Sequence, residues 1–188
     1  MSKNILVIAA HADDEVLGCG GTLAKHSEEG DRVGIILMTD GVSSRQFASQ
    51  AEIKKRSANR SAAFSILGVE LVENFSFPDN ALDSIPLLEV AQAIEKAAAS
   101  FGKPDIIYTH WSGDLNIDHQ IVSKAVLTAF RPLHGNSQEI YGFEVLSSTG
   151  WQSPERTFSP RLYVDIADEI DTKLKACLLY TSPSPRDA

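Results

Sequence analysis

A short polar segment near the N-terminus combines residue types that bind metal ions and transfer protons. His11, Asp13 and Asp14 lie in the segment AHADDE, directly after an apolar run at 4–10. His11 and Asp14 are three residues apart where a loop turns into a helix, so both side chains can point into one cavity. Asp13 is adjacent to Asp14 but faces differently, which places it to take a proton from a metal-activated water. The segment therefore predicts a metal site with a neighbouring general base.

A second polar cluster, after an apolar run at 105–109, could complete the metal site. His119 from this cluster would join His11 and Asp14 as the third ligand. Two imidazoles and one carboxylate bind zinc and leave a position for water, as a catalytic site requires. The metal would lower the pKa of that water and polarise a carbonyl group. Acidic residues are also common caps at helix N-termini, so the spacing alone allows a site without metal.

Further polar residues at predicted strand ends extend the candidate site. They are Asp40 after the second apolar run, and His110, Asp114, Asn116 and Asp118 after the run at 105–109. His110 fits a site residue and a ring packed beside Trp111 equally well. Glu15 is interpreted as an acid at a helix start, which the helix dipole favours.

Substrate contacts are the least constrained part of the prediction. The candidates are Asp40, Arg45, Arg56, Asp79 and Asp118. They lie in segments or at strand ends that could line a pocket, and ordinary loop and helix-surface positions fit Arg45, Arg56 and Asp79 equally well. Asp79 and Asn80 after Pro78 also form a natural turn.

The elements that position these residues alternate between strands and helices. Strands are predicted at 4–10, 32–38, 69–75, 105–109, 139–146 and 161–166. Helices are predicted at 14–29, 51–67, 84–101 and 118–130, the third with Ser84 as its N-cap. This rhythm predicts an α/β fold, a Rossmann-like three-layer α/β/α arrangement with a mostly parallel sheet. Such sheets bind ligands at the carboxyl ends of their strands, where the polar clusters lie.

The composition and charge of the chain exclude several classes of protein. Its 188 residues suit one domain, and 43% hydrophobic with 22% charged residues is typical of a globular protein. A net charge of −8 without a Lys/Arg cluster argues against nucleic acid as a partner. No apolar run reaches the length of a membrane span or of a signal-peptide core, which predicts a cytoplasmic protein. Cys19 and Cys177 lack the spacing of a thiolate site, so His and carboxylates must hold any metal.

Three glycines allow a rival interpretation, the binding of a dinucleotide. Gly18, Gly20 and Gly21 follow the first strand, and Asp40 ends the second. A dinucleotide fingerprint places its first glycine directly after the strand, whereas here AHADDEVL intervenes. The charged AHADDE segment would also repel a pyrophosphate, so the metal site is favoured.

The segment AHADDE resembles AHPDDE, the signature of the LmbE/PIG-L family of zinc-dependent N-deacetylases. The similarity continues to residue 175 through VLGCGGTLAKH, the strand ending in TDG, Arg56 with Ala63 and Leu67-Gly68, and NIDH at 116–119. It implies that His11, Asp14 and His119 hold Zn²⁺, with Fe²⁺ as another possible metal, and that Asp13 is the base. The implied reaction removes the N-acetyl group from an N-acetylglucosamine-like sugar or sugar conjugate. The small-molecule partner would be an acetamido sugar, and the oligomeric state is not predicted.

Departures from the family pattern keep two other functions open. Asn116 stands where many members carry a histidine thought to stabilise or protonate the tetrahedral intermediate, and an amide cannot supply a proton at neutral pH. His110 or Asp114 could compensate. Ala12 replaces the usual proline, and Asn59 a frequent glutamate. The alternatives are a metal-binding, sugar-recognising relative with little turnover, and a metal hydrolase of another amide or ester.

The end of the chain differs in character from the rest. The sequence CLLYTSPSPRD begins at Cys177 and contains Ser-Pro repeats that cannot continue a helix. It also resembles the translation of one reading frame of a transposase sequencing adapter. We therefore expect a single domain at 1–176, truncated at its C-terminus, and a non-native tail at 177–188.

Overall fold

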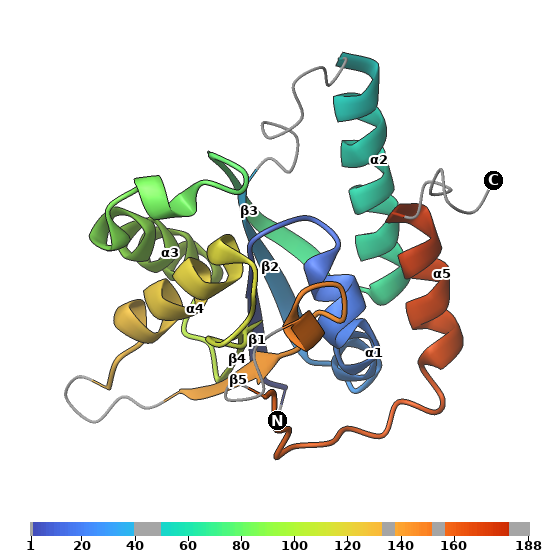
Figure 1. Ribbon diagram of the computed structural model, residues 1–188. Helices are drawn as coiled ribbons and strands as arrows, with labels where there is room; N and C mark the ends of the chain where they lie inside the picture. Colours follow the sequence, from blue (N-terminus) through green and yellow to red (C-terminus); the bar gives the residue numbers. More distant parts are fainter. Residues whose placement is uncertain (1, 40–49, 133–137, 152–156, 181–188) are drawn as a thin grey trace.

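One sheet of five parallel strands forms the centre of the protein, in the order β3-β2-β1-β4-β5 (Figure 1). The computed structural model describes residues 2–39, 50–132, 138–151 and 157–180. The strands are β1 (Asn4–Ala9), β2 (Arg32–Thr39), β3 (Glu70–Phe77), β4 (Ile106–His110) and β5 (Glu139–Phe143). The helices are α1 (Asp14–Glu28), α2 (Gln50–Leu67), α3 (Leu87–Phe101), α4 (Ile117–Ala129) and α5 (Ile170–Tyr180).

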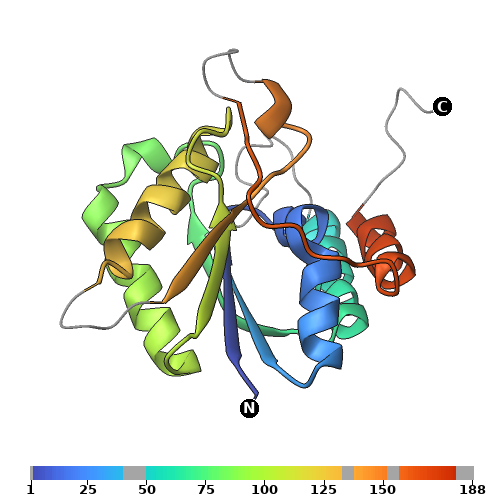
Figure 2. The same cartoon turned by 90° about the horizontal axis from the view of Figure 1, so that it is seen from below.

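Helices cover both faces of the sheet, so the predicted three-layer α/β/α arrangement is confirmed. Figure 2 shows α3 and α4 on one face and α1, α2 and α5 on the other. Two short 3₁₀ helices, η1 (Leu82–Ser84) and η2 (Thr149–Trp151), follow strands β3 and β5. Among the described residues, no helix is both long and apolar enough to cross a membrane.

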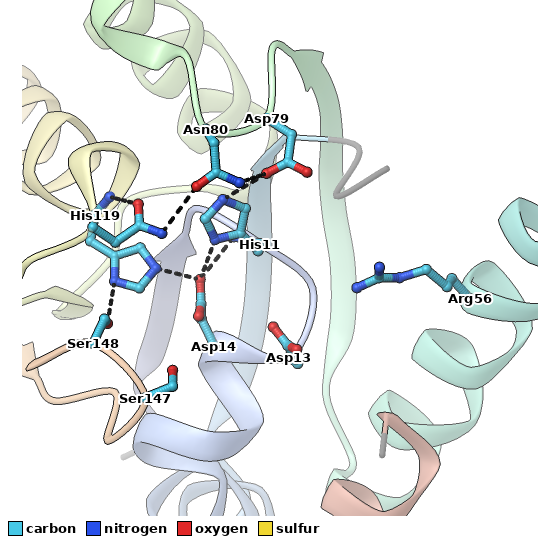
Figure 3. Close-up of a pocket in the computed structure, with 10 residues that line it drawn as sticks. His11, Asp13, Asp14, Arg56, Asp79, Asn80, His119, Ser147 and Ser148 are labelled. Atoms are coloured by element: carbon cyan, nitrogen blue, oxygen red, sulfur yellow. Dashed lines mark hydrogen bonds and ion pairs between the residues drawn. The ribbon is translucent and has the colours of Figure 1, made fainter. Parts of the chain in front are cut away.

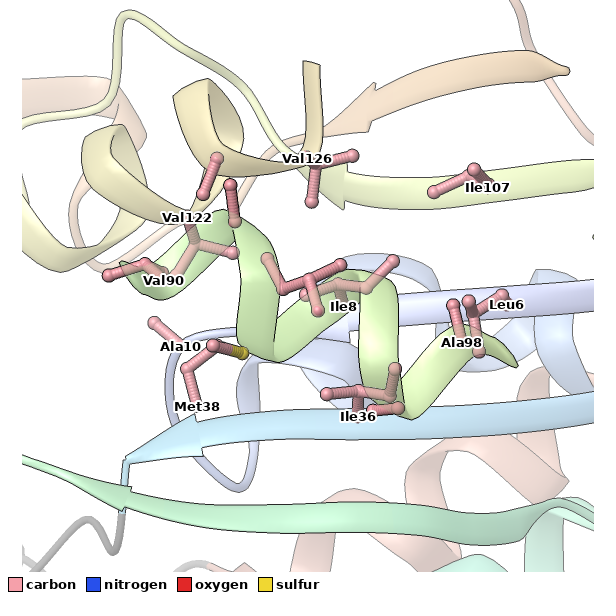
Figure 4. Packing of buried hydrophobic residues seen from close by; sticks show 14 of the residues in the cluster. Leu6, Ile8, Ala10, Ile36, Met38, Val90, Ala98, Ile107, Val122 and Val126 are labelled. Atoms are coloured by element: carbon pink, nitrogen blue, oxygen red, sulfur yellow. The ribbon is translucent and has the colours of Figure 1, made fainter. Parts of the chain in front are cut away.

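Strand β1 contributes to both hydrophobic layers because its side chains alternate between the two faces. Leu6 and Ile8 belong to the cluster beneath α3 and α4 (Figure 4), whereas Ile5 and Val7 belong to the cluster on the α1 side. All four side chains are fully buried. A strand covered on both faces needs a continuous apolar sequence, which explains the unbroken apolar run at 4–10.

The strand order places the two polar clusters side by side. The sheet grows from β1 towards β2 and β3 in one direction and from β4 towards β5 in the other, and β1 pairs with β4 over Ile5–Ile8 and Ile106–Thr109. Ligand sites of open α/β sheets form where the order reverses in this way. The segment after β1 and the loop after β4 therefore meet at one edge.

The strand predicted at 161–166 does not form, which corrects the sequence interpretation. This segment is extended, but none of its residues is assigned to a strand. The Ile166 side chain packs directly on Gly21 of α1, where a Cβ atom would lie 2.5 Å from it. Lys25 of α1 donates a hydrogen bond to the Asp165 carbonyl at 2.8 Å. The segment thus binds to a helix instead of extending the sheet.

Two predicted boundaries also differ. Ser84 ends η1, where its hydroxyl donates to the Ala81 carbonyl, and α3 begins after Pro86 without a side-chain cap. Proline cannot donate a backbone hydrogen bond and suits the start of a helix. At the C-terminus, α5 continues to Tyr180 and so crosses the boundary predicted at residue 176. The domain division itself stays a prediction.

The glycines that suggested a dinucleotide site serve helix packing. Gly18, Gly20 and Gly21 lie within α1 and not in a turn after β1. A side chain at Gly18 would overlap the Phe143 ring, and one at Gly21 would overlap Ile166. Gly18 and Gly21 thus let α1 approach β5 and the segment that contains Ile166.

Candidate functional site

The segment after β1 turns sharply so that two of its side chains face the same point. The backbone N–H of His11 donates to Asp14 Oδ2 at 2.9 Å, and His11 Nδ1 lies 3.2 Å from the same oxygen. Asp13, between them, has a φ of 138°, a region that L residues rarely adopt. Such backbone strain persists where the surrounding structure holds it, and it is common at functional sites.

His119 lies in the first turn of α4 and completes the cluster. It comes from the β4 side of the point where the strand order reverses. His119 Nε2 lies 3.2 Å from Asp14 Oδ2, so both imidazoles point at one carboxylate oxygen (Figure 3). One ligand atom from each of His11, Asp14 and His119 lies within 4.8 Å of the other two. His119 Nε2 is buried, and its 3.2 Å contact with Asp14 lacks hydrogen-bond geometry. A buried nitrogen without a hydrogen bond, next to a second imidazole and a carboxylate, fits a divalent metal ion.

The outer nitrogen of each histidine faces a further carboxylate. His11 Nε2 lies 3.0 Å from Asp118 Oδ2 and 3.2 Å from Asp79 Oδ1. His119 Nδ1 lies 3.1 Å from Asp114 Oδ1. A carboxylate on the outer nitrogen fixes the tautomer and leaves the inner nitrogen free to bind a metal, an arrangement found at most histidine metal sites.

The charges of this cluster shift the pKa values of its members. Burial lowers the pKa of His11, but the hydrogen bonds with Asp118 and Asp14 outweigh it and raise the pKa to about 10. For His119, burial is likewise outweighed, here by Asp114 and Asp14, and the pKa rises to about 9. Burial opposes ionisation of Asp14, yet the surrounding imidazoles hold its pKa well below the usual range. Asp14 is therefore an anion in the folded protein.

Asp13 is set apart from the ligand cluster by its electrostatic environment. Burial and the negative charge of Asp14 raise the pKa of Asp13 to about 6. Its backbone N–H donates to Glu15 Oε2 at 3.1 Å. Glu15 is fully buried, which raises its pKa to about 8, so it is an internal group that braces the turn. The sequence had placed Glu15 correctly at the helix start but did not predict its burial.

A mostly polar pocket of about 240 Å³ opens over the cluster. It is lined by His11, Asp13, Asp14, Arg56, Asp79, Asn80, Asn116, His119, Ser147 and Ser148. Figure 3 shows Arg56 reaching towards it from α2 and the two serines closing it on the side of the segment after β5. Of the expected substrate contacts, Arg56 and Asp79 thus lie on the pocket wall. Asp40 and Arg45 lie outside the described residues.

His110 and Asp118 lie behind the pocket and not on its wall. The Ala10 backbone N–H donates to His110 Nε2 at 2.9 Å, and burial lowers the pKa of this histidine to about 3. The carboxylate of Asp118 accepts hydrogen bonds from the backbone N–H groups of Asn80, at 2.7 Å, and Leu82, at 3.0 Å. Asp118 therefore holds the turn at Asp79 and orients His11 from behind.

Asn116 lines the pocket and also caps helix α4. Its Oδ1 accepts hydrogen bonds from the backbone N–H groups of Asp118, at 2.8 Å, and His119, at 3.4 Å. Its Nδ2 lies 3.5 Å from Asn80 Oδ1. The amide oxygen is thus used for capping, and the amide N–H groups are the part that faces Asn80.

Ser147 and Ser148 belong to the stretch from Ser147 to Trp151, whose part in the site the sequence left open, and both line the pocket. Both follow β5, and the signal that could have found them is the rule that had located the other clusters. The segments after β1, β3 and β4 all contribute polar residues to the pocket, and the segment after β5 is another strand end at the same edge.

Comparisons with known proteins found relatives of similar sequence and similar fold. The PIG-L family, described as GlcNAc-PI de-N-acetylase, matches residues 6–130. The chain is 29% identical to an uncharacterized deacetylase, YaiS, of Escherichia coli, over 94% of this chain and 89% of that protein. It is 30% identical to the diacetylchitobiose deacetylase of Thermococcus kodakarensis, over 98% of this chain and 72% of the relative. The solved N,N'-diacetylchitobiose deacetylase of Pyrococcus horikoshii superimposes with a TM-score of 0.76 at 25% identity, over 99% of this chain and 72% of that one.

Proposed function

Because the chain belongs to the PIG-L family, we propose that it is a zinc-dependent hydrolase that removes the N-acetyl group from an N-acetylglucosamine-like sugar or sugar conjugate. The relatives named above are deacetylases, two of them of diacetylchitobiose. The reaction is the hydrolysis of a linear amide, which gives a free amine and acetate.

One observation carries the proposal: the inner nitrogens of two histidines point at the same oxygen of Asp14. His11, Asp14 and His119 would hold the metal. Two imidazoles with one carboxylate are a frequent catalytic zinc set, and Fe²⁺ is a second metal that such ligands accept. When bound, the metal supplies a Lewis acid for the amide carbonyl and increases the acidity of water.

Asp13 has the position and the pKa of a general base. It lies on the pocket wall beside the ligand cluster, and its pKa of about 6 leaves it ionised near neutral pH. A base whose pKa lies close to the working pH both accepts a proton from water and releases it to the leaving nitrogen. We assign both transfers to Asp13.

The rest of the pocket wall suits the hydroxyl groups of a sugar. Arg56, Asp79, Asn80, Ser147 and Ser148 offer donors and acceptors and no large apolar surface. Asp40 and Arg45 are further candidates from the sequence. The contribution of Asp118 would be indirect, through the turn that carries Asp79 and Asn80.

A relative with little turnover is the second candidate, and Asn116 is the observation that favours it. Its amide cannot deliver a proton to the leaving group, and its oxygen already caps α4. His110 is too deeply placed to replace it, because its ring is fully buried and does not line the pocket. Asp114 is engaged with His119 and Thr149.

Acetate release from a panel of acetamido sugars tests these candidates. We expect the metal-loaded protein to release acetate, chelation to abolish this, and Asp13→Asn to lower kcat by about 10²–10⁴-fold. Asp83→Asn, at an exposed position in η1, is the matched control. Metal binding without acetate release across the panel would favour the second candidate. If the protein instead hydrolysed only other amides or esters, it would be a different metal hydrolase. A cytoplasmic location remains a prediction from the sequence.

A further inference from the structure

The carboxylate behind His119 is held in place by three groups of the protein. Asp114 is 1% exposed. Its Oδ1 lies 3.1 Å from His119 Nδ1 and accepts the backbone N–H of Asn116 at 2.9 Å. Its Oδ2 accepts a hydrogen bond from the hydroxyl of Thr149. Each oxygen therefore has a defined partner, and only one of the two is available to His119.

Thr149 uses its hydroxyl group twice. Besides donating to Asp114, Thr149 Oγ1 accepts the backbone N–H of Val145 at 2.8 Å. The Thr149 backbone N–H in turn donates to the Val145 carbonyl at 2.8 Å. Thr149 is 3% exposed, so water does not replace either hydroxyl contact easily. The hydroxyl thus closes the segment 145–149 and fastens it to Asp114.

This segment carries part of the pocket wall. Ser147 and Ser148, which line the pocket, lie between Val145 and Thr149. The same hydroxyl therefore connects the wall that faces a substrate with the carboxylate behind a candidate metal ligand.

His119 Nδ1 has a second neighbour besides Asp114, the hydroxyl group of Ser148, so the position of Asp114 decides which tautomer the ring adopts. Ser148 Oγ lies 3.4 Å from His119 Nδ1. A hydroxyl can donate or accept, so Ser148 alone would allow either tautomer of the ring. A carboxylate only accepts, and at 3.1 Å it holds a proton on Nδ1, so that Nε2 is the nitrogen left to bind a metal.

We propose that Thr149 is a positioning residue that couples the pocket wall at Ser147 and Ser148 to the orientation of the metal ligand His119 through Asp114. The proposal rests on the proposed function, because it assigns His119 to a metal. Its consequence is that loss of one hydroxyl weakens metal binding and substrate binding together, although Thr149 touches neither.

Three variants test the coupling, with metal affinity as a readout that needs no substrate. Thr149→Val keeps the shape of the side chain but removes the hydroxyl, whereas Thr149→Ser retains it. Asp114→Asn acts at the other end of the same hydrogen bond. Thr128→Val is the control, since Thr128 is a threonine whose exposed hydroxyl bonds only within α4. Zn²⁺ affinity is measured by competition with a chelating dye, and the visible spectrum of the Co²⁺-loaded protein reports the ligand geometry.

We expect Thr149→Val to lower Zn²⁺ affinity by about 10–100-fold and to change the Co²⁺ spectrum. At saturating metal it should also raise KM for the best acetamido sugar more than it lowers kcat. Thr149→Ser and Thr128→Val should behave as the wild type, and Asp114→Asn should lose metal affinity without the same rise in KM.

The inference is overturned if folded Thr149→Val keeps wild-type Zn²⁺ affinity, spectrum and KM. If Thr149→Val does not fold, a wild-type affinity and spectrum in Asp114→Asn overturn it instead. Failure of the proposed function looks different: the wild type then releases no acetate, while the metal titrations of the variants still decide whether Thr149 orients His119.

Discussion

The imidazole rings of His110 and His119 lie stacked, with their centroids 3.8 Å apart and their planes 10° apart. Of these two rings, that of His119 lines the pocket and that of His110 does not. His110 accepts the Ala10 N–H through Nε2 and is kept neutral because burial lowers its pKa to about 3. A neutral ring can lie flat against His119 without adding a positive charge, so His110 serves as a platform for the candidate ligand.

His110→Ala should therefore impair stability and metal binding more than proton transfer. It leaves the Ala10 N–H without its partner and opens a cavity beside His119, which together cost about 2–4 kcal/mol of the free energy of unfolding. Urea unfolding and Zn²⁺ competition measure the two effects. At saturating metal, kcat should stay within about tenfold of wild type, the scale of about 1.4 kcal/mol. A kcat loss of about 10²-fold or more with normal metal affinity would instead make His110 a proton donor.

Metal binding should release protons near neutral pH. The carboxylates around His11 and His119 outweigh their burial and raise their pKa values to about 10 and about 9, so both rings are protonated at pH 7 in the metal-free protein. Only neutral imidazoles bind metal, whereas Asp14 is already ionised. About two protons should leave per ion, and affinity should rise with pH until about pH 10, the higher of the two pKa values. Calorimetry in buffers of different ionisation enthalpy counts them, and a count near zero at pH 7 contradicts the assignment.

Substitution of Asn116 separates its two roles. Asn116→His introduces a side chain that can supply a proton at the pocket wall, so we expect a higher kcat on acetamido sugars. It removes the cap of α4, at a cost of about 1 kcal/mol of unfolding free energy. Asn116→Asp is the matched comparison, because a carboxylate caps equally well but is no proton donor at neutral pH. If both variants leave kcat unchanged, proton donation at this position is not what limits turnover.

Glu15 should make the stability of the metal-free protein depend on pH. Burial raises its pKa from 4.5 to about 8, so the folded state retains a proton that the unfolded state loses. Its contribution is complete below pH 4.5 and declines as the pH rises towards 8. Glu15→Gln should remove this decline and be the more stable protein at pH 8. Chemical unfolding at several pH values measures it, and parallel curves for both proteins would refute the prediction.

The sequence was most informative where burial imposes a simple pattern. The apolar runs at 4–10 and 105–109 predicted β1 and β4. The polar clusters that follow these runs contain His11, Asp14 and His119, which the structure brings together. The run at 161–166 misled because its Ile166 side chain packs on helix α1, and strand propensity cannot tell a helix surface from a sheet neighbour.

Contacts between distant segments were beyond the reach of sequence patterns. The hydrogen bond from Thr149 to Asp114 joins residues whose types are common in any loop, and nothing in their spacing marks it. The burial of Glu15 was missed for a similar reason, since its position in the first turn of α1 fits an exposed acid equally well. The Thr149–Asp114 hydrogen bond and the burial of Glu15 both depend on how segments distant in the sequence pack against one another.

The separation of the candidate ligands along the chain has a consequence for folding. His11 and Asp14 follow β1, whereas His119 begins α4, so the ligand set is complete only after β1 and β4 have paired. A divalent ion held by all three acts as a cross-link that closes a loop of roughly 100 residues, where the entropy cost in the unfolded chain is large. The first of these ligands to leave the ribosome must therefore wait for the last, and metal loading reports on the pairing of β1 with β4.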